Sequence, residues 1–401
     1  MASAYFLNRS GWDVTVIDRG EIGHGCSYGN ACLIVASHSK PIAAPGVIGQ
    51  ALRWMFEKDA PFYIRPRLDS SLIRWTWQFR RYCQAAAVER AFPVLLRLSR
   101  ESLRLYDTLR SSGEADFFFE RRGLLEVFLS DAGVDSAPHT REELEAAGFT
   151  VRLLSPGESQ DLEPALSPRV RGSLLVEGEA HGSSYGYVRA MAETLEARGA
   201  RLLPARPLAR MLTTDGRIHG VVVDRPHEEI PADLVVLAAG SWSGDLASPL
   251  GIEIPLQPAK GYSCTIDAYP GSPRIPIWVK ERRVIVTPLE GRLRFGGTLE
   301  LSGFDTTINR VRYGAVVRAG REVLKNPPTM KNEEPWAGLR PVTPDGLPII
   351  DRARSIHGLI VATGHAMLGF TQAPMTGKLV AELANGDEPS LPLAPFRLDR
   401  F

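Results

Sequence analysis

The sequence predicts an α/β protein in which a parallel and an antiparallel sheet belong to two domains. Two observations predict this class. Apolar strands, one ending at Asp18 and one stopped at Gly240, read as parallel strands buried on both faces. Segments such as RRVIVTP and LRFGGTLEL instead alternate around Glu290–Gly291, which is typical of antiparallel strands.

Length and composition exclude several classes of protein. At 401 residues the chain is long for one core, so two domains, interleaved or consecutive, are expected. A net charge of +1 with no basic block argues against a nucleic-acid surface. Four cysteines without a Cys-x-x-Cys pair argue against a disulfide scaffold or a thiolate metal site, and favour a reducing cytoplasm. We expect no signal peptide and no membrane span, because no apolar run approaches ~20 residues.

The first elements resemble the second half of a dinucleotide-binding βαβ unit. Residues 2–10 predict a helix, Gly11 a left-handed cap, and Val14–Ile17 a short strand closed by Asp18. An acidic residue about 20 residues past a Gly-x-Gly-x-x-Gly turn holds a ribose hydroxyl in such units. Neither that turn nor the strand before it is present, so we expect a nucleotide domain truncated at its N-terminus. A helix and strand of some other α/β domain is the equal alternative.

The next predicted elements are a loop, helices and a hairpin. Residues 21–52 carry only Glu21 and Lys40 as charges, which indicates a buried loop. Leucines at helical spacing predict amphipathic helices over residues 68–111. Two short strands, 117–119 and 124–128, are expected to form a hairpin around Arg121–Gly123.

The second half alternates helices with strands. A helix is expected over residues 187–197, ending at Gly199, and a hairpin around Asp215–Gly216. After the apolar strand in ADLVVLAAGSWS, the C-terminal GLIVATGHAMLGFTQAPMTGKLVAELANG predicts a strand, a glycine turn and a helix over residues 373–383.

Four segments occur in the order of one known family: GWDVTVIDR, LVVLAAGSW, WAGLRPVTPDGLPII and LIVATGHAMLGFTQAPMTG. Over nearly the whole chain they resemble the flavin-dependent amine oxidoreductases of the D-amino-acid oxidase and glycine oxidase superfamily. GCSYGNA, the AAPG segment, PAKGYS and LAPFRLDRF are most similar to bacterial D-amino-acid dehydrogenases. The resemblance implies a discontinuous Rossmann-like FAD-binding domain (residues 1–50, 151–250 and 334–401). It is interleaved with an antiparallel-sheet substrate domain (residues 51–150 and 251–333).

The resemblance also implies three candidate catalytic residues. Arg340 in GLRP matches the position that clamps the substrate carboxylate, a role that suits the planar fork of a guanidinium; a surface arginine is the alternative. Tyr262 in PAKGYS matches a position near the substrate pocket, and a structural tyrosine is equally open. His365 either lines the pocket or supports it from behind. No general base is assigned, because hydride leaves the α-carbon once the amine is neutral.

The implied cofactor is non-covalent FAD, since no cysteine lies near Arg340 or His365 in the sequence. Cys32 stands where relatives commonly carry glycine; a small buried hydrophobe is the plainer explanation of this residue. No metal site is expected. The expected cofactor-binding residues are Asp18, Arg19, Cys26, Ser27, Asn30, Ala31, Ala239, Gly240, Trp242, Gly364, His365, Gly369 and Thr371.

The function that these expectations favour is FAD-dependent oxidation of a D-amino acid, with a proline-like one among the candidates, to an imino acid. Electrons would pass to a quinone or another acceptor. An oxidase using oxygen is the alternative enzyme, and a truncated, non-functional product is the alternative of another class. The aromatic cluster in ALRWMFEKDAPFYIRP is either packing, a lid, or an edge that touches lipid. The expected location is therefore the cytoplasm, including its membrane surface.

Overall fold

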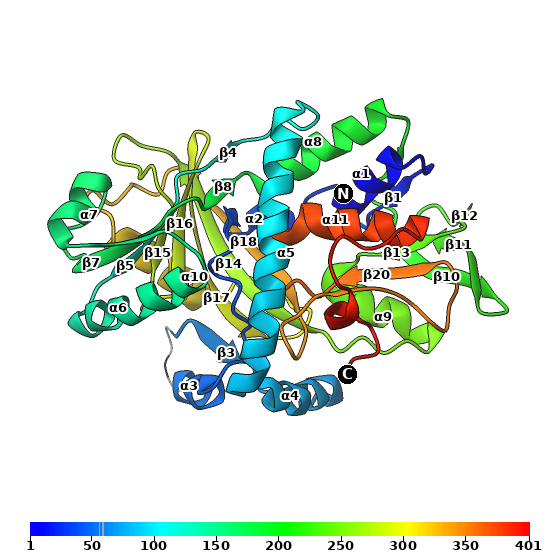
Figure 1. Ribbon diagram of the computed structural model, residues 1–401, viewed down its shortest axis with the longest axis horizontal. Helices are drawn as coiled ribbons and strands as arrows, with labels where there is room; N and C mark the ends of the chain where they lie inside the picture. Colours follow the sequence, from blue (N-terminus) through cyan, green and yellow to red (C-terminus); the bar gives the residue numbers. More distant parts are fainter. Residues whose placement is uncertain (56, 58–59) are drawn as a thin grey trace.

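The computed structural model describes residues 1–55, 57 and 60–401. The predicted α/β class is confirmed: a large sheet lies on one side of the long helix α5 (Ala85–Ser111), and the sheet that contains β13 (Val235–Leu237) and β20 (Leu359–Thr363) lies on the other (Figure 1). The remaining helices are α1 (Ala2–Arg9), α2 (Cys26–Gly29), α3 (Val47–Trp54), α4 (Ser70–Tyr82), α6 (Asp131–Ala146), α7 (Pro156–Leu162), α8 (Ser184–Ala197), α9 (Ser243–Ala247), α10 (Arg310–Glu322) and α11 (Gly369–Asn385), with short 3-10 turns η1 (Gly240–Trp242), η2 (Ser248–Leu250) and η3 (Ala394–Phe396).

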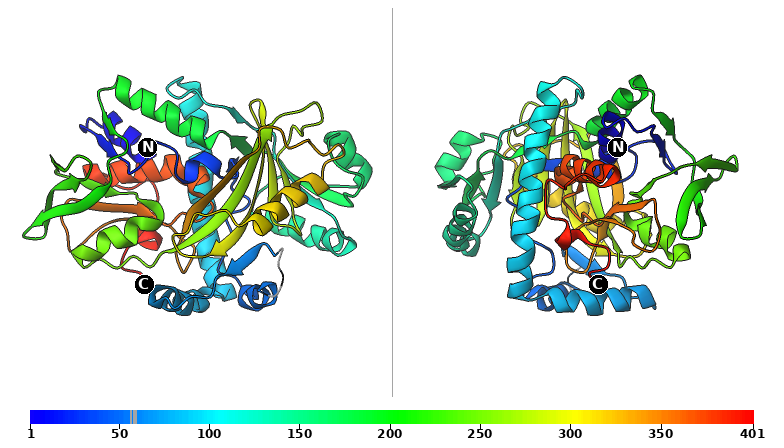
Figure 2. Two further views of the ribbon diagram at one scale, coloured as in Figure 1. Left: turned by 180° about the vertical axis from the view of Figure 1, so that it is seen from behind. Right: turned by 45° about the vertical axis from the view of Figure 1, so that its right-hand side comes forward.

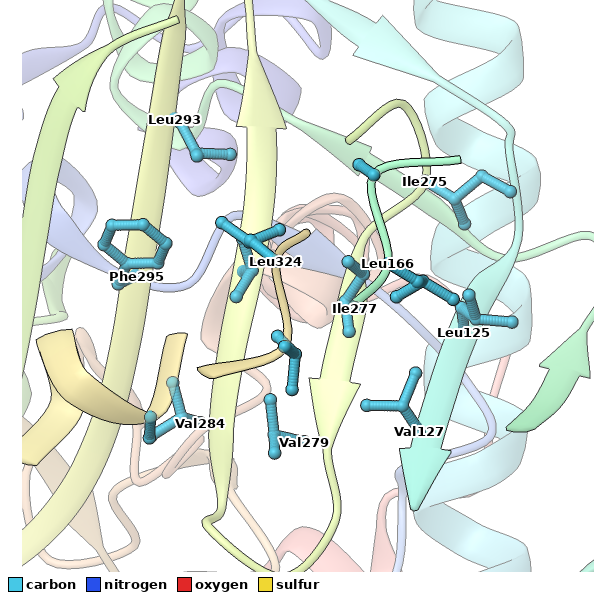
Figure 3. Close-up of a cluster of buried hydrophobic side chains, with 14 of the residues drawn as sticks. Leu125, Val127, Leu166, Ile275, Ile277, Val279, Val284, Leu293, Phe295 and Leu324 are labelled. Atoms are coloured by element: carbon cyan, nitrogen blue, oxygen red, sulfur yellow. The ribbon is translucent and has the colours of Figure 1, made fainter. Parts of the chain in front are cut away.

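The large sheet is mostly antiparallel and carries the main core of this half. Its strand order is β18 (Glu334–Val342), β14 (Gln257–Asp267), β17 (Arg292–Leu301), β16 (Val284–Leu289), β15 (Ile277–Val279), β5 (Leu124–Phe128), β7 (Gly172–Val176) and β6 (Val151–Leu154), with β3 (Phe62–Ile64) added beside β17. One face buries apolar side chains such as Ile277 and Phe295 against Leu324 (Figure 3). The β16–β17 turn at Glu290–Gly291 confirms the predicted antiparallel pair.

The parallel strands lie in two separate groups. β1 (Thr15–Ile17) pairs in parallel with β9 (Arg201–Leu203), and β13 (Val235–Leu237) pairs in parallel with β20 (Leu359–Thr363), which also pairs with β19 (Ile349–Arg352). Val16 and Val236 nevertheless pack in one apolar cluster, and Ile17 and Val235 in another. Among the described residues, β1 and β13 each have a single strand neighbour, so each leaves one edge unpaired.

Two small sheets complete the fold. β10 (Leu208–Thr214), β11 (Arg217–Val223) and β12 (Glu228–Pro231) are antiparallel, and the predicted hairpin turn at Asp215–Gly216 is confirmed, with both residues at positive φ. β2 (Leu33–Ile34), β8 (Ala180–Gly182) and β4 (Phe119–Glu120) form the other sheet. No helix in the described part of the chain combines the length and apolarity that crossing a bilayer requires.

Three sequence expectations are wrong in detail. Residues 21–52 contain α2, β2 and the start of α3 rather than a plain loop. The expected hairpin around Arg121–Gly123 does not form, because β4 pairs with β8 while β5 pairs with β7 and β15. Helix α11 begins at Gly369 and includes Pro374. Proline lacks an N–H, and the carbonyl of Phe370 that it leaves free accepts the Tyr106 hydroxyl at 2.5 Å instead.

Strand pairing and helix packing cross the expected domain boundaries in three places. Residues 151–176, assigned to the FAD-binding domain, contribute β6 and β7 to the large sheet, because β7 pairs with β5. β18 likewise forms the edge of that sheet through its pairing with β14. α5 packs on α11 although the sequence assigned it to the substrate domain. Figure 2 shows α5 running along the junction of the two halves.

Candidate functional site

Arg340 lies near the end of β18, on the face of the large sheet that meets α2. It is opposite Ala259 in β14, and its guanidinium covers Gly261, the next residue of β14 on the same face. One nitrogen donates a hydrogen bond to the carbonyl of Thr298 at 2.9 Å. Burial lowers the pKa of Arg340, but a guanidinium remains protonated. Within the described residues it makes no ion pair with a carboxylate, so its charge is available to an anion.

Two side chains fix the backbone beside Arg340. The thiol of Cys26, at the start of α2, donates to the carbonyl of Leu339 at 2.8 Å, and the hydroxyl of Ser241 donates to the same oxygen at 3.3 Å. The sequence placed Cys26 beside the flavin and found no cysteine near Arg340. The structure corrects the second point, since Cys26 bonds to the residue that precedes Arg340.

The turns after β13 and β20 lie against each other. Gly240 and Gly364 follow these parallel strands at positive φ, and the hydroxyl of Thr363 donates to the carbonyl of Gly240 at 3.0 Å. Ala239 precedes this turn as the residue before η1. The carboxyl ends of parallel strands form the crevice in which α/β folds bind nucleotides.

The end of β1 reaches the same region. The guanidinium of Arg19 lies 3.6 Å from the centre of the Trp242 ring, a cation–π contact between the β1 end and η1. The Asp18 carboxylate accepts a hydrogen bond from the Gly20 amide at 2.9 Å, which fixes its direction. These contacts bring Asp18, Arg19 and Trp242 to one edge.

The segment after α2 is held by a residue that sequence reasoning missed. Arg294 of β17 is buried and donates to Thr265, to the carbonyl of Asn30 and to the sulfur of Cys32. Arg294 occupies a polar position of the alternating LRFGGTLEL segment, so no local signal distinguished it from a solvent-facing arginine. Cys32 adopts φ 59°, a conformation that glycine reaches without strain. Cys32 therefore adopts a glycine-like backbone conformation at a position where relatives commonly carry glycine, and its sulfur accepts a hydrogen bond from Arg294.

Serine and threonine hydroxyls anchor neighbouring parts of this segment. Ser184 donates to the carbonyl of Ser27 at 2.6 Å, and Thr287 donates to that of Ala31 at 2.7 Å. The Thr371 hydroxyl, in the first turn of α11, accepts a hydrogen bond from the Val35 amide at 3.1 Å. These contacts join α2, the large sheet and α11 around one region.

Tyr262 is not brought to this group. It lies in the apolar cluster on the opposite face of the large sheet, and its hydroxyl donates to Glu300 at 2.6 Å. Side chains of a strand alternate between faces, so Gly261 rather than Tyr262 lies on the side of Arg340. The expectation that Tyr262 lines the substrate pocket is corrected by this placement.

His365 lies in the turn between β20 and α11, as expected, and pairs with Val342 of β18 through an isolated bridge. Its Nε2 is 2.9 Å from the Thr376 hydroxyl. Burial lowers the pKa of His365 to about 4, so the imidazole is neutral near pH 7.

The residues present fit an FAD group. Two glycine turns meet at the carboxyl ends of parallel strands, and α11 starts at Gly369 beside them without a side-chain cap. Uncapped N–H groups of a helix N-terminus suit negative charge. No cluster of three or more His, Cys, Asp or Glu able to hold a metal occurs among the described residues.

Comparison with known proteins gives one family and consistent relatives. The sequence model of the family described as "DAO: FAD dependent oxidoreductase" matches residues 1–383. D-amino acid dehydrogenase of Cereibacter sphaeroides is 32% identical over 407 residues, covering 100% of this chain and 93% of the relative. The enzyme of the same name from Paramagnetospirillum magneticum is also 32% identical, and the matched region covers 100% of this chain and 96% of the relative.

Solved structures share the fold. Glycine oxidase from Geobacillus kaustophilus superposes with a TM-score of 0.78 at 22% identity, over 100% of this chain and 95% of that one. L-proline dehydrogenase from P.horikoshii gives 0.72 at 21% identity, over 100% and 94%. At these identities the likeness concerns the fold.

Proposed function

The chain belongs to the DAO family of FAD-dependent oxidoreductases, and from this premise we propose that it oxidises a D-amino acid to the corresponding imino acid. Water then hydrolyses the imine to a 2-oxo acid and ammonia. The D-amino acid is supported by relatives at 32% identity that are named D-amino acid dehydrogenases.

The observation that carries this proposal is the unpaired guanidinium of Arg340. A zwitterionic amino acid presents a carboxylate, and a fork of N–H donors binds a carboxylate through two parallel bonds. One nitrogen of Arg340 is engaged by Thr298, and the described residues offer no competing carboxylate. Arg340 thereby binds and orients the substrate. Neutral His365 with its Nε2 engaged is not positioned as a base.

We assign the FAD site to the edge where β1, β13 and β20 end. Asp18 and Arg19 are assigned to the adenosine side of the cofactor. The remainder of the cofactor is assigned to the other expected residues, which include Asn30, Ala31, Gly240, Gly364, Gly369 and Thr371. FAD, when bound, supplies the hydride acceptor. We propose non-covalent binding. If FAD is bound non-covalently, acid precipitation of the protein releases the flavin into the supernatant. Flavin that stays with the precipitated wild-type protein, but is released from Cys26→Ala, contradicts non-covalent binding.

The test of the function is a flavin spectrum followed by a panel of amino acids. Addition of the D-enantiomer of the true substrate under argon bleaches the oxidised flavin band, and its L-enantiomer does not. The panel includes D-proline, because a proline-like substrate is among the expectations. A flavin that no D-amino acid reduces, but that L-amino acids do reduce, refutes the stereochemical assignment.

We propose a quinone or another acceptor in place of oxygen, supported by the dehydrogenase names of the relatives. Stopped-flow mixing of the reduced protein with air-saturated buffer and with a soluble quinone measures both rates. Fast reoxidation by air with peroxide release favours the oxidase alternative.

A specific surface supports contact with a membrane. α3 and α4 lie side by side (Figures 1 and 2) and expose Ile48, Leu52, Ile73 and Trp77 at helical spacing of four. The same two helices also carry arginines. Among the described residues, no ion pair is formed by Arg53, Arg80 or Arg81. Apolar residues beside basic ones are typical of helices that lie in the headgroup region of anionic lipids. Of the aromatic cluster considered above, Phe56, Lys58 and Asp59 lie outside the described residues.

Vesicle co-sedimentation tests this surface. We expect binding to vesicles that contain phosphatidylglycerol, weaker binding to pure phosphatidylcholine, and loss of binding in Leu52→Glu/Ile73→Glu. Leu153→Glu, an exposed leucine of β6, is the matched control. Equal binding of the double variant and the control contradicts the proposal.

A further inference from the structure

Thr298 in β17 has an unusual backbone. Its φ is +65° although it is a β-branched residue, and it is 8% exposed. Residues of this kind are rare in the left-handed region, because the Cβ atom approaches the backbone. Such outliers persist where the surrounding structure holds them, and they cluster at functional sites.

The strand partners explain why Thr298 is held there. β16 pairs with β17 as far as Gly297, and β3 pairs with it from Leu299 onward. Against β14, the pairing passes from Lys260–Glu300 to Tyr262–Gly297, so β17 has one extra residue. Thr298 therefore lies in a β-bulge between two partners, where a carbonyl is free to leave the ladder.

That carbonyl accepts from Arg340 at 2.9 Å. Gly261 provides the space for the guanidinium: a Cβ atom on Gly261 would lie only 2.3 Å from one terminal nitrogen of Arg340 and 2.5 Å from Cζ. The position of the guanidinium is thus set on two sides, by a bulge carbonyl and by a glycine.

On the face of the large sheet opposite Arg340, the buried carboxylate of Glu300 fixes the residues around the bulge. Glu300 accepts from Tyr262 at 2.6 Å and pairs with Lys260 at 3.2 Å. Arg312 lies 3.8 Å from the same carboxylate and donates to the carbonyl of Ala60 at 3.0 Å, just before β3. β14, β17 and the chain leading to β3 are therefore joined directly beneath Thr298.

We propose that Thr298 and Gly261 are positioning residues for substrate binding. The bulge carbonyl of Thr298 holds one edge of the Arg340 guanidinium over Gly261, which leaves the other donors directed at the substrate carboxylate. This inference rests on the proposed role of Arg340 and adds the residues through which that role is set.

Ligands that separate the carboxylate from the amine test the proposal on the FAD-loaded protein. D-alanine serves as substrate, propionate as the carboxylate probe and ethylamine as the amine probe, with binding read from the flavin spectrum. In Gly261→Ala, we expect the Kd of propionate and the KM of D-alanine to rise at least tenfold, with ethylamine binding and kcat within threefold. Gly157→Ala, whose added Cβ meets nothing within 4 Å, is the matched control.

Two substitutions of Thr298 keep the test open if Gly261→Ala fails to fold. Glycine in Thr298→Gly reaches φ +65° without strain, but its backbone also samples other conformations, so the carbonyl at position 298 is held less firmly against Arg340. The Kd of propionate should therefore rise several-fold. Thr298→Asn favours the left-handed region and should retain wild-type affinity. If Arg340→Ala weakens propionate binding while Gly261→Ala and Thr298→Gly stay within twofold of wild type, this inference is wrong and the proposed function stands. If Arg340→Ala also leaves propionate binding unchanged, the proposed function fails.

Discussion

Replacing Arg340 gives the sharpest prediction for the proposed activity. The guanidinium carries five N–H donors, of which one is bound to the Thr298 carbonyl. A carboxylate bound to the free edge makes two charge-assisted bonds, each worth ~1.5–3 kcal/mol. Their loss amounts to ~3–6 kcal/mol, and since ~1.4 kcal/mol is tenfold in rate, kcat/KM in Arg340→Ala should fall roughly 100- to 10,000-fold. Arg340→Lys retains one bond and should lose about 10- to 100-fold.

The assay is steady-state turnover of a D-amino acid with a dye acceptor, normalised to bound flavin. Arg292→Ala is the matched control. Arg292 lies in the same sheet, on β17, which is separated from the strand of Arg340 by β14, and its guanidinium pairs with Glu334 at a distance of 3.2 Å. We expect normal flavin content and activity in the control. An Arg340→Ala protein with full flavin and kcat/KM within threefold of wild type would refute the reasoning.

Two further predictions concern stability. Burial lowers the pKa of His181 to about 4, so the folded state binds fewer protons than the unfolded state between pH 6.5 and 4. The free energy of unfolding therefore falls by up to about 3 kcal/mol as the pH falls through this window. In His181→Gln, the difference between the free energies of urea unfolding measured at pH 7 and at pH 4.5 should be smaller than in the wild type. Glu179 is buried and accepts from the amides of Ala36 and Ser37, so Glu179→Ala should cost about 2–5 kcal/mol in chemical unfolding, and a loss under 1 kcal/mol contradicts this assignment.

Local signals in the sequence determined many elements directly. Asp215–Gly216 and Glu290–Gly291 supply turns between alternating runs, and both antiparallel pairs form. Gly11, Gly240 and Gly364 mark the ends of a helix and two strands, and all three have positive φ. These positions are predictable because turn residues and apolar periodicity act within a few residues of the chain.

Pairing partners were decided by the tertiary structure. The residues around Arg121–Gly123 read as a hairpin, yet β4 and β5 belong to different sheets, since β8 and β7 are better placed partners. The start of α11 was misjudged for a similar reason. The hydroxyl of Tyr106, more than 250 residues away, satisfies the carbonyl that Pro374 leaves free.

For the site, the family resemblance assigned Arg340 and His365 to the pocket region, and local apolar runs marked the strands that end near Gly240 and Gly364. Only the tertiary structure decided which side of a strand each residue faces. Tyr262 and Gly261 are neighbours in the sequence, but the pleat sends Tyr262 to Glu300 and leaves Gly261 beneath Arg340. The bulge at Thr298 depends on where β16 ends and β3 begins, two strands far apart in the chain. No local pattern contains that information, because the geometry arises when distant segments compete for the same strand edge.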